Sequence, residues 1–326
     1  MLCIKSTTNN PAFNLATEEY LLKHKDEECF YLYINHPSII VGKHQNTLAE
    51  INVEHVKKER IDVIRRLSGG GAVFHDPGNL NFTFIKKGEK DKLVDFRKYT
   101  QPILDVLVKH GVEAKFEGRN DLTIEGKKFS GNAEHVYQNK ILHHGTLLFS
   151  SKLPDLSKAL RVNPLKYKDK AVKSVRSRVT NISVHLKYPL TLQQFEDSIV
   201  EHVRDMYIDS RIYELTEEDK AAIQKLVDEK YGTWQWNYGY SPEYNFQKGM
   251  KTQGGHIEVN LDVHKGLIKK AKIYGDFFNT KDVQELENLL EGLPHDYNQL
   301  NEQLKAIDIS EYFSNVTREE FIDGLF

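Results

Sequence analysis

Cysteine is scarce in this chain of 326 residues, and Cys3 and Cys29 are its only thiols. Neither belongs to a Cys-x-x-Cys pair, which argues against disulfide stapling and against a zinc clamp and favours a reducing compartment. The sequence also lacks an apolar run long enough to span a bilayer, and residues 1–10 lack the hydrophobic centre of a signal peptide. We therefore expect a soluble protein of the cytoplasm.

An excess of charge of one sign is also missing. The formal net charge is -2, so the chain as a whole attracts neither nucleic acid nor a membrane surface, and such binding would need a local patch. Proline is infrequent, with 9 residues, while hydrophobic residues make up 39% and charged residues 28% of the chain. These values are typical of a globular protein, and the length suits a large core with a small appendage.

Helical and strand patterns follow one another irregularly in the first half of the chain. Apolar periodicity predicts helices over residues 14–24, 53–60 and 102–110, and strands over residues 30–35, 38–41, 62–64, 81–85, 122–125, 127–130 and 141–149. Most of these strands adjoin one another rather than alternating with helices. The pattern therefore predicts an α+β fold rather than a doubly wound parallel sheet.

A second, smaller unit is predicted at the C-terminal end. We expect a linker over residues 244–254, then a hairpin whose strands, 257–263 and 267–274, flank a turn at His264-Lys265-Gly266. Two or three short helices follow from Lys281. The chain would thus divide into a large domain, residues 1–245, and a small C-terminal domain, residues 246–326.

The most informative segment is a glycine run between two predicted strands, RRLSGGGAVFHD at residues 65–76. Three consecutive glycines allow backbone conformations that a Cβ would forbid, so successive N–H groups can converge on an anion. Arg65 and Arg66 would supply fixed positive charge for a phosphate or a carboxylate. The run is not a dinucleotide fingerprint, because its third glycine is absent and a strand follows, and it is not a P-loop. The alternative is a glycine-rich connection that binds nothing.

A second polar cluster, Gly118-Arg119-Asn120-Asp121, precedes a predicted hairpin that carries Lys127 and Lys128. A lysine held over a nucleotide's α-phosphate and an attacking carboxylate would neutralise the charge that develops in the transition state. Asp121 could hold a magnesium ion or orient that lysine. A single exposed lysine is, however, most often only a solvated side chain, so the cluster alone leaves both interpretations open.

Basic residues crowd the segment from Lys166 to Arg178. The segment could be a solvated loop, a lid that closes over a phosphate or a nucleic-acid patch. Only Tyr167 could stack on a base there, so little supports the nucleic-acid alternative.

Two adjacent histidines, His143 and His144, fall on one predicted strand. Neighbouring residues of a strand face opposite sides, which argues against joint metal ligation. We expect one of the two to be packed in the core.

Taken together, these segments resemble the lipoate–protein ligase family. The matching stretches are RRLSGGGAVFHDPGNLNFTF, GRNDLTIEGKKFSGNA, HHGTLLF and VKSVRSRVTNIS, together with NLAxEE at residues 14–19 and WNxG at residues 236–239. The resemblance covers almost the whole chain from about Pro11. It implies a catalytic domain like those of biotin–protein ligases and class II synthetases, with mixed, largely antiparallel sheets, and a small α+β accessory domain.

The resemblance also implies an activity. Lipoate and ATP, with Mg²⁺, would give lipoyl-AMP and pyrophosphate, and the lipoyl group would then pass to a specific lysine of an acceptor protein as an amide. The implied acceptors are the glycine cleavage H protein, the E2 subunits of 2-oxoacid dehydrogenases, or both. Neither nucleic acid nor a membrane is implied as a partner.

Roles for individual residues follow from the same resemblance. The family's essential lysine, in its K-x-S-G motif, falls on Lys128, which would be catalytic and would contact both ATP and lipoate. The other expected ATP contacts are Arg66, Gly71, Ala72, Val73, Phe74, Asn120, Asp121, Ser174 and Arg176, with Asp121 also the candidate ligand for Mg²⁺. The other expected lipoate contacts are Ser68, Gly69, Gly70 and His75, with Phe30, Leu67 and Leu80 along the apolar tail. The segment from Ser174 to Arg178 resembles the family's adenylate-covering loop.

Two other functions compete with ligation. A transferase of the same fold would move lipoyl or octanoyl groups between carrier proteins without ATP, and its thioester-forming members need a cysteine in the site. Cys3 and Cys29 lie outside every polar motif, which argues against that chemistry. The other alternative is a non-catalytic module that binds an adenylate or nucleic acid.

Overall fold

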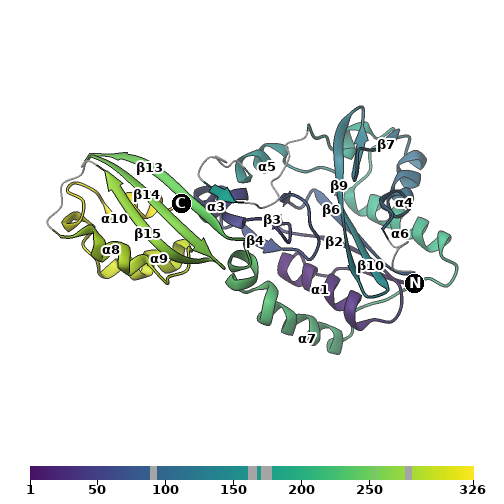
Figure 1. Cartoon of the computed structure of the whole chain (residues 1–326). Helices are drawn as coiled ribbons and strands as arrows, with labels where there is room; N and C mark the ends of the chain where they lie inside the picture. The colour runs from purple at the N-terminus through teal and green to yellow at the C-terminus, as the bar shows by residue number, and fades with distance from the viewer. Residues whose placement is uncertain (89–93, 161–166, 170–177, 254, 276–280) are drawn as a thin grey trace.

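The computed structural model describes residues 1–326 except 89–93, 161–166, 170–177, 254 and 276–280. The chain forms a larger body with two sheets and a smaller C-terminal body with a third sheet, as Figure 1 shows. Both bodies combine helices with sheets; the sheets of the larger body are of mixed strand direction and that of the C-terminal body is antiparallel, which confirms the predicted α+β class. Among the helices of the described residues, none combines the length and apolar character needed to cross a membrane.

An eight-stranded sheet forms the centre of the larger body. In spatial order its strands are β12 (Arg211–Ile212), β1 (Leu2–Lys5), β2 (Cys29–Ile34), β6 (Asn79–Lys87), β10 (Lys140–Leu148), β9 (Lys127–Tyr137), β8 (Asp121–Ile124) and β7 (Ala114–Glu117). Strand β1 pairs in parallel with β12 and with β2, and the other pairs are antiparallel. The predicted hairpin around Gly126 is confirmed as β8–β9, and Glu125 (φ 51°) and Gly126 (φ 71°) both take the left-handed backbone that a tight hairpin turn requires.

The glycine run belongs to a separate three-stranded sheet. Its strands are β4 (Asp62–Arg65), β3 (Ser38–Val41) and β5 (Val73–His75), with β3 in the middle. Strand β4 is parallel to β3 and β5 is antiparallel to it. The residues between β4 and β5 must therefore cross one end of this sheet, and they carry the three glycines.

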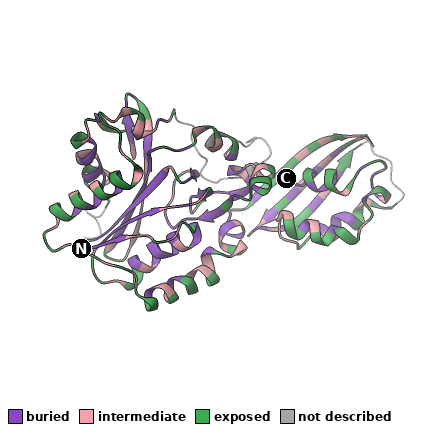
Figure 2. Cartoon of the chain, turned by 180° about the vertical axis from the view of Figure 1, so that it is seen from behind, coloured by how far each residue is buried: buried purple, intermediate pink, exposed green. Residues whose placement is uncertain are grey.

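Helices cover both faces of the large sheet. They are α1 (Pro11–His24), α4 (Phe96–Lys109), α6 (Leu192–Met206) and α7 (Glu217–Leu226). Three further helices, α2 (Thr47–Glu50), α3 (Val53–Glu59) and α5 (Leu153–Ala159), instead contribute to the buried cluster that contains the three-stranded sheet. Helices α1 and α7 pack with alternate residues of β2 such as Tyr31 and Tyr33, while α4 and α6 pack with Phe30 and Leu32 on the opposite face (Figure 1). Because helices cover both faces, the central strands of this sheet are buried on both sides, and Figure 2 shows them in purple along much of their length.

The C-terminal body contains a four-stranded sheet covered by helices. The strands are β11 (Tyr167–Asp169), β13 (Tyr244–Thr252), β14 (Gly255–His264) and β15 (Leu267–Gly275), and the helices are α8 (Val283–Leu290), α9 (Tyr297–Gln303) and α10 (Arg318–Gly324). The predicted hairpin and helices are confirmed. The linker expected over residues 244–254 is wrong, because β13 occupies most of it and pairs with β14 from Tyr244 to Thr252. Few residues of β13 are apolar, so its residue pattern alone does not indicate a strand.

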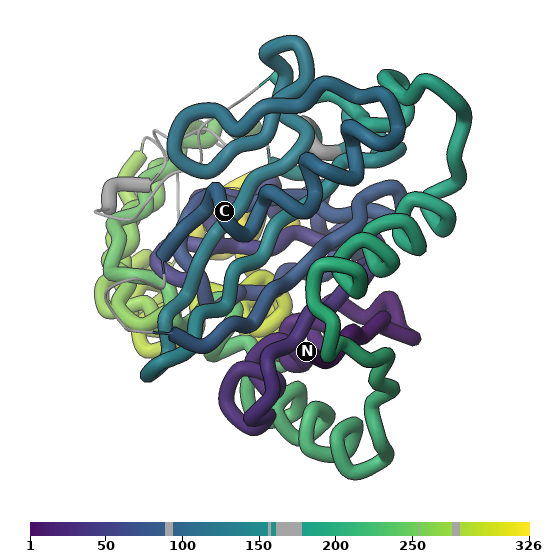
Figure 3. The backbone as a smooth tube through the Cα atoms, turned by 90° about the vertical axis from the view of Figure 1, so that its right-hand side faces the viewer, coloured from purple at the N-terminus to yellow at the C-terminus, as the bar shows by residue number. Residues whose placement is uncertain are grey.

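The two bodies share one hydrophobic core. Ile39 and Phe74 of the three-stranded sheet belong to the same buried cluster as Phe246 and Phe313 of the C-terminal body. The C-terminal body lies largely behind the larger body when the molecule is viewed from the N-terminal end, as in Figure 3. The three-stranded sheet, which carries the glycine run, therefore packs against the C-terminal body as well as belonging to the larger one.

Candidate functional site

A pocket of about 420 Å³ lies between the large sheet, the glycine run and the β8–β9 hairpin. Ten of the residues expected in the site line it: Arg66, Gly69, Gly70, Gly71, Ala72, Val73, His75, Asn120, Asp121 and Lys128. These residues come from segments far apart in the sequence. The fold therefore brings the two separate polar motifs together in one cavity.

Arg66 holds the glycine run in place. Its Nη2 donates to the carbonyl oxygens of Gly69 at 2.6 Å and Gly71 at 2.8 Å, and its Nη1 donates to that of Ile40 at 3.1 Å. Burial lowers the pKa of Arg66 to about 10, so it remains charged at neutral pH. Because the C=O and N–H of a trans peptide point in opposite directions, the N–H of Gly70 is directed away from Arg66. Gly70 has φ 90°, which a side chain would disfavour.

Arg65 does not belong to the site, contrary to the expectation that both arginines flank the anion. Adjacent residues of β4 face opposite ways, and the Arg65 side chain is fully buried away from the pocket. Its guanidinium donates to oxygens of two segments, residues 42–47 and 236–241. Arg65 is a structural residue of the junction between these segments.

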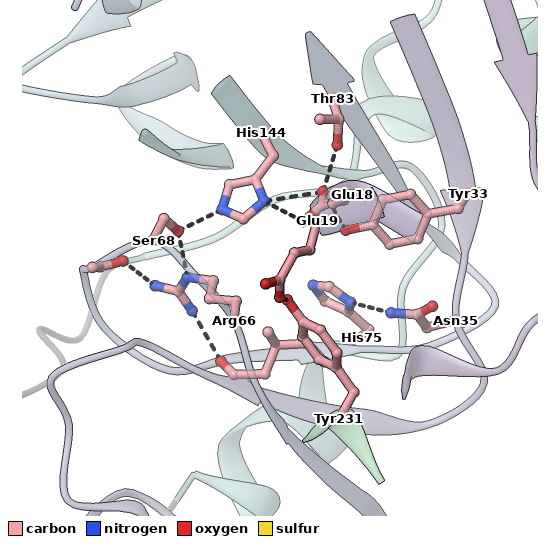
Figure 4. A network of polar contacts seen from close by, with 12 residues as sticks. Glu18, Glu19, Tyr33, Asn35, Arg66, Ser68, His75, Thr83, His144 and Tyr231 are labelled. Carbon is pink, nitrogen blue, oxygen red and sulfur yellow. Dashed lines mark hydrogen bonds and ion pairs between the residues drawn. The ribbon is translucent and has the colours of Figure 1, made fainter. Parts of the chain in front are cut away.

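A buried chain of hydrogen bonds fixes the start of the glycine run (Figure 4). Ser68 Oγ lies 2.5 Å from His144 Nε2, and His144 Nδ1 lies 2.9 Å from Glu18 Oε2. Glu18 Oε1 also accepts from Thr83 Oγ1 at 2.5 Å and Tyr33 OH at 3.1 Å. His144 thus bridges the Glu18 carboxylate through Nδ1 and the Ser68 hydroxyl through Nε2.

This order of serine, histidine and carboxylate is that of a nucleophilic triad, but its surroundings differ. Ser68 is 1% exposed and does not line the pocket. Its Oγ also accepts from Arg66 Nε at 3.1 Å, which reduces its electron density. Ser68 is thus held as a support of the loop and is poorly placed to attack a substrate.

Lys128 and Asp121 form an ion pair on the opposite side of the pocket. Lys128 Nζ lies 2.8 Å from Asp121 Oδ1, and both side chains are about 30% exposed, at 28% and 31%. The end of the lysine lies over Gly131, where a Cβ would approach its Cε and Nζ to 2.9 Å. The backbone of Lys128 also exchanges hydrogen bonds with Arg178 and Thr180. The C-terminal end of the basic segment is therefore fixed beside Lys128.

His75 is the other titratable group of the glycine-run strand. It is 3% exposed, and burial together with the charge of Arg66 lowers its pKa to about 3, so the ring is neutral. Its Nδ1 lies 3.0 Å from Asn35 Nδ2, while its Nε2 is buried without a hydrogen-bond partner.

Comparison with known proteins identifies the family of the chain. Residues 10–204 match the lipoyl protein ligase A/B catalytic domain, and residues 241–325 match the bacterial lipoate protein ligase C-terminus. The lipoate–protein ligase LplJ of Bacillus subtilis is 44% identical over 98% of this chain and 97% of its own length. The chain belongs to the lipoate–protein ligase family. It is thus similar in sequence to enzymes over nearly its full length.

Solved structures agree with this assignment. Plasmodium falciparum LipL1, in complex with lipoate, has a TM-score of 0.64 and is 26% identical, covering 99% of this chain and 97% of its own. A lipoate–protein ligase A bound with ATP is 24% identical with a TM-score of 0.62, over 73% of this chain and 98% of its own. The second comparison shows a shared fold only.

Some expected site residues of this family member lie elsewhere. Phe74 packs in the core shared by the two bodies, and Ser68 supports the loop from behind. Ser174 and Arg176 lie outside the described residues. Phe30, Leu67 and Leu80 are buried in core clusters and do not line the pocket, so the prediction that they contact the apolar tail is wrong. The apolar residues that line the pocket are Leu15, Tyr33, Ile40, Ala72, Val73, Phe96 and Ala133.

Two residues of the site, Glu18 and His144, were assigned no function from the sequence. Both lie in stretches that match the family, yet nothing in one sequence shows that α1 and β10 meet at the pocket.

Within the part of the chain that the structure describes, no group of three or more His, Cys, Asp or Glu side chains could hold a metal ion. The predicted opposite facing of the two histidines is confirmed, since His143 pairs with Glu134 at 2.8 Å and His144 with Glu18.

Proposed function

We propose that this chain is an ATP-dependent lipoate–protein ligase that forms lipoyl-AMP and then transfers the lipoyl group to a lysine of an acceptor domain. The main support is that Lys128 and the glycine run held by Arg66 line one pocket. A cation on one wall and backbone N–H groups on the other suit two anionic groups, a carboxylate and a phosphate, held side by side.

Formation of the adenylate needs both Lys128 and the glycine run. A carboxylate is a poor electrophile, so it must become a mixed anhydride with AMP before an amine can attack it. Holding the carboxylate and the α-phosphate side by side removes the entropic cost of their encounter. Lys128 would offset the repulsion between them, and the same charge would stabilise the acyl oxygen when the acceptor amine attacks.

The nucleotide would bind along the glycine run and the start of β8. Gly71, Ala72 and Val73 are the residues of the run that we assign to the nucleotide, while the Gly70 N–H, which is directed away from Arg66, is a candidate donor to the lipoate carboxylate. Asn120 and Asp121 line the same pocket. Mg²⁺ would arrive with the nucleotide phosphates, because one protein carboxylate with phosphate oxygens and water suffices for that ion. Asp121 is the residue that fits this role, and the ion would neutralise phosphate charge.

An ATP-independent transferase that uses a thioester finds no support in the site. Cys3 and Cys29 are 1% and 0% exposed and lie in β1 and β2 rather than along the pocket. Burial raises the pKa of Cys29 to about 12, which leaves almost no thiolate at neutral pH. Two buried free thiols also suit the reducing cytoplasm that we propose as the compartment.

The division of labour between the two bodies belongs to the same proposal. Residues 1–245 would hold lipoate and ATP, and residues 246–326 would form the accessory domain. The boundary is approximate, because β13 already begins at Tyr244 and β11 of the first half pairs with it. The acceptors we propose are lipoyl domains of H protein or E2 subunits.

Pyrophosphate release tests the proposed activity. The purified chain is incubated with ATP and Mg²⁺, with and without lipoate, and lipoyl-AMP is detected by mass spectrometry. Acceptor labelling is then measured across a panel of lipoyl domains. Lipoate-dependent pyrophosphate and adenylate are the expected result. Labelling of acceptors that is undiminished when ATP is omitted would instead support the transferase.

A further inference from the structure

His75 presents a buried nitrogen with no partner at the wall of the pocket. Its Nε2 makes no hydrogen bond with any described residue, although the side chain is almost completely buried and the residue lines the cavity. A buried polar atom without a partner destabilises the fold and therefore calls for an explanation. Figure 4 shows Asn35 on one side of the ring and the other ring nitrogen turned toward the middle of the network.

The orientation of Asn14 can be read from atoms that have only one possible role. Its Nδ2 lies 3.1 Å from the carbonyl oxygen of Thr8 and 3.3 Å from that of Ile34. A backbone carbonyl can only accept, so the amide nitrogen of Asn14 must be on that side. Its Oδ1 then accepts from Tyr31 OH at 2.8 Å.

The orientation of the Asn14 amide determines that of Asn35, which in turn determines the protonated nitrogen of His75. The Asn14 Nδ2 group donates to Asn35 Oδ1 at 2.8 Å, which turns the Asn35 Nδ2 toward His75. That amide nitrogen can only donate, so His75 Nδ1, 3.0 Å away, must be an unprotonated acceptor. In a neutral imidazole the proton then resides on the other nitrogen.

We infer that Asn14 and Asn35 are positioning residues that lock His75 as the Nε2–H tautomer, so that it donates a hydrogen bond to a carboxylate oxygen of the bound acyl substrate. This inference rests on the proposed function, because it takes lipoate as that substrate. The carboxylate is the strong acceptor that lipoate offers, since its sulfur atoms accept hydrogen bonds only weakly. A neutral donor also adds no third cation beside Arg66 and Lys128.

The tautomer can be measured in the free protein. Two-bond ¹H–¹⁵N correlation spectra of the ¹⁵N-histidine-labelled chain distinguish Nε2–H, Nδ1–H and charged rings, and the His75→Gln spectrum identifies the His75 signals. We expect the Nε2–H pattern at pH 8.5 and again at pH 6. An Nδ1–H pattern, or a charged ring at pH 6, would overturn the inference whether or not the chain proves to be a ligase.

The substitution Asn35→Asp should reverse the tautomer of His75 with almost no change in side-chain shape. Its carboxylate still accepts from Asn14, but it can only accept from His75, so at pH 8.5 the proton should move to Nδ1 and leave a lone pair on Nε2. Lipoate affinity, measured by calorimetry, should fall about 10- to 100-fold, as expected for a lost hydrogen bond to a charged group. Asn10→Asp is the matched control, because Asn10 is an exposed N-cap of α1 whose role an aspartate also fills.

Octanoate distinguishes an oxygen contact from a sulfur contact, because it has the carboxylate without the dithiolane. An equal loss of affinity for lipoate and octanoate in Asn35→Asp supports the inference. A loss confined to lipoate, or unchanged affinity despite a reversed tautomer, contradicts it. If the wild-type chain binds neither acid while the Nε2–H signal is present, the proposed function fails and the tautomer assignment stands.

Discussion

Lys128 depends on a neighbour that has no side chain. Its Nζ pairs with Asp121 and lies directly over Gly131. The position of its charge therefore depends on the β8–β9 hairpin, on the Asp121 carboxylate and on the absence of a Cβ at Gly131. The sequence could predict the importance of this lysine from its motif and from the hairpin that carries it. It could not predict that His144 lines the same pocket or that Glu18 and Asn35 hold the two pocket histidines, because these contacts join residues far apart in the chain.

Gly131→Ala should displace this charge without removing it. The new Cβ would meet the end of Lys128 at 2.9 Å, so the flexible side chain must move. We expect lipoate-dependent adenylate formation to fall about 10- to 100-fold, as is typical when a charge that stabilises a transition state is misplaced. The matched control is Gly249→Ala, whose Cβ meets the end of His256 at 2.9 Å within the C-terminal sheet. Equal rates for the two variants would contradict the positioning role.

The three-stranded sheet is the element that connects the site to the rest of the molecule. Its middle strand contacts both β4 and β5, and adjacent arginines at the end of β4 face opposite directions. Arg66 secures the glycine run, and Arg65 secures segments 42–47 and 236–241. The sequence predicted the strand before the run and the basic pair, but it assigned both arginines to one anion. Which arginine faced inward depended on sheet pairing that no local pattern specifies.

Arg65→Lys should therefore act on stability rather than on substrate. A lysine cannot reproduce the fork of a guanidinium that bonds two segments at once, and several buried carbonyls would lose their donor. We expect the free energy of unfolding to fall by about 3 kcal/mol or more, measured by urea denaturation. Arg211→Lys, at an exposed arginine 3.5 Å from Glu27, should change it by less than about 1 kcal/mol. A similar small effect at position 65 would contradict the structural role.

At the scale of the whole molecule, buried neutral histidines make the fold sensitive to acid. Burial lowers the pKa of His75 and His143 to about 3 and that of His295 to about 4. The unfolded chain would bind protons at these sites near pH 6.5. His143 is partly compensated by Glu134, whose pKa burial raises to about 7, since that carboxyl releases a proton on unfolding. The net effect thus comes mainly from His75, His295 and His135, whose pKa burial also lowers to about 4.

The free energy of unfolding should fall as the pH drops from about 6.5 toward 4. The unfolded state binds more protons in this range, and each of these three histidines contributes up to about 1.4 kcal/mol per pH unit. Urea denaturation at pH 7.5, 6.5, 5.5 and 4.5 measures this slope, and His295→Gln should reduce it. A stability that stays constant from pH 6.5 to 4.5 would contradict the assignment of neutral rings.

The general architecture could be foreseen at this scale, but the way the bodies join could not. Alternating Ile257, Val259, Leu261 and Val263 predicted β14, and they are buried as expected. Strand β13 was missed because most of its residues are polar or glycine, and its pairing with β14 supplies the order that its own sequence does not. The core shared by both bodies likewise depends on contacts between distant segments.

The most direct test of the proposed chemistry compares two adjacent lysines. Lipoate-dependent exchange of pyrophosphate into ATP is measured for the wild-type chain, for Lys128→Ala and for Lys127→Ala. Lys127 is the matched control, because it is an exposed neighbour that does not line the pocket. We expect exchange to be abolished in Lys128→Ala, with an unchanged circular dichroism spectrum, and to stay within about twofold of wild type in Lys127→Ala. Wild-type exchange by Lys128→Ala would contradict the central claim that this one amine joins the acyl group to the nucleotide.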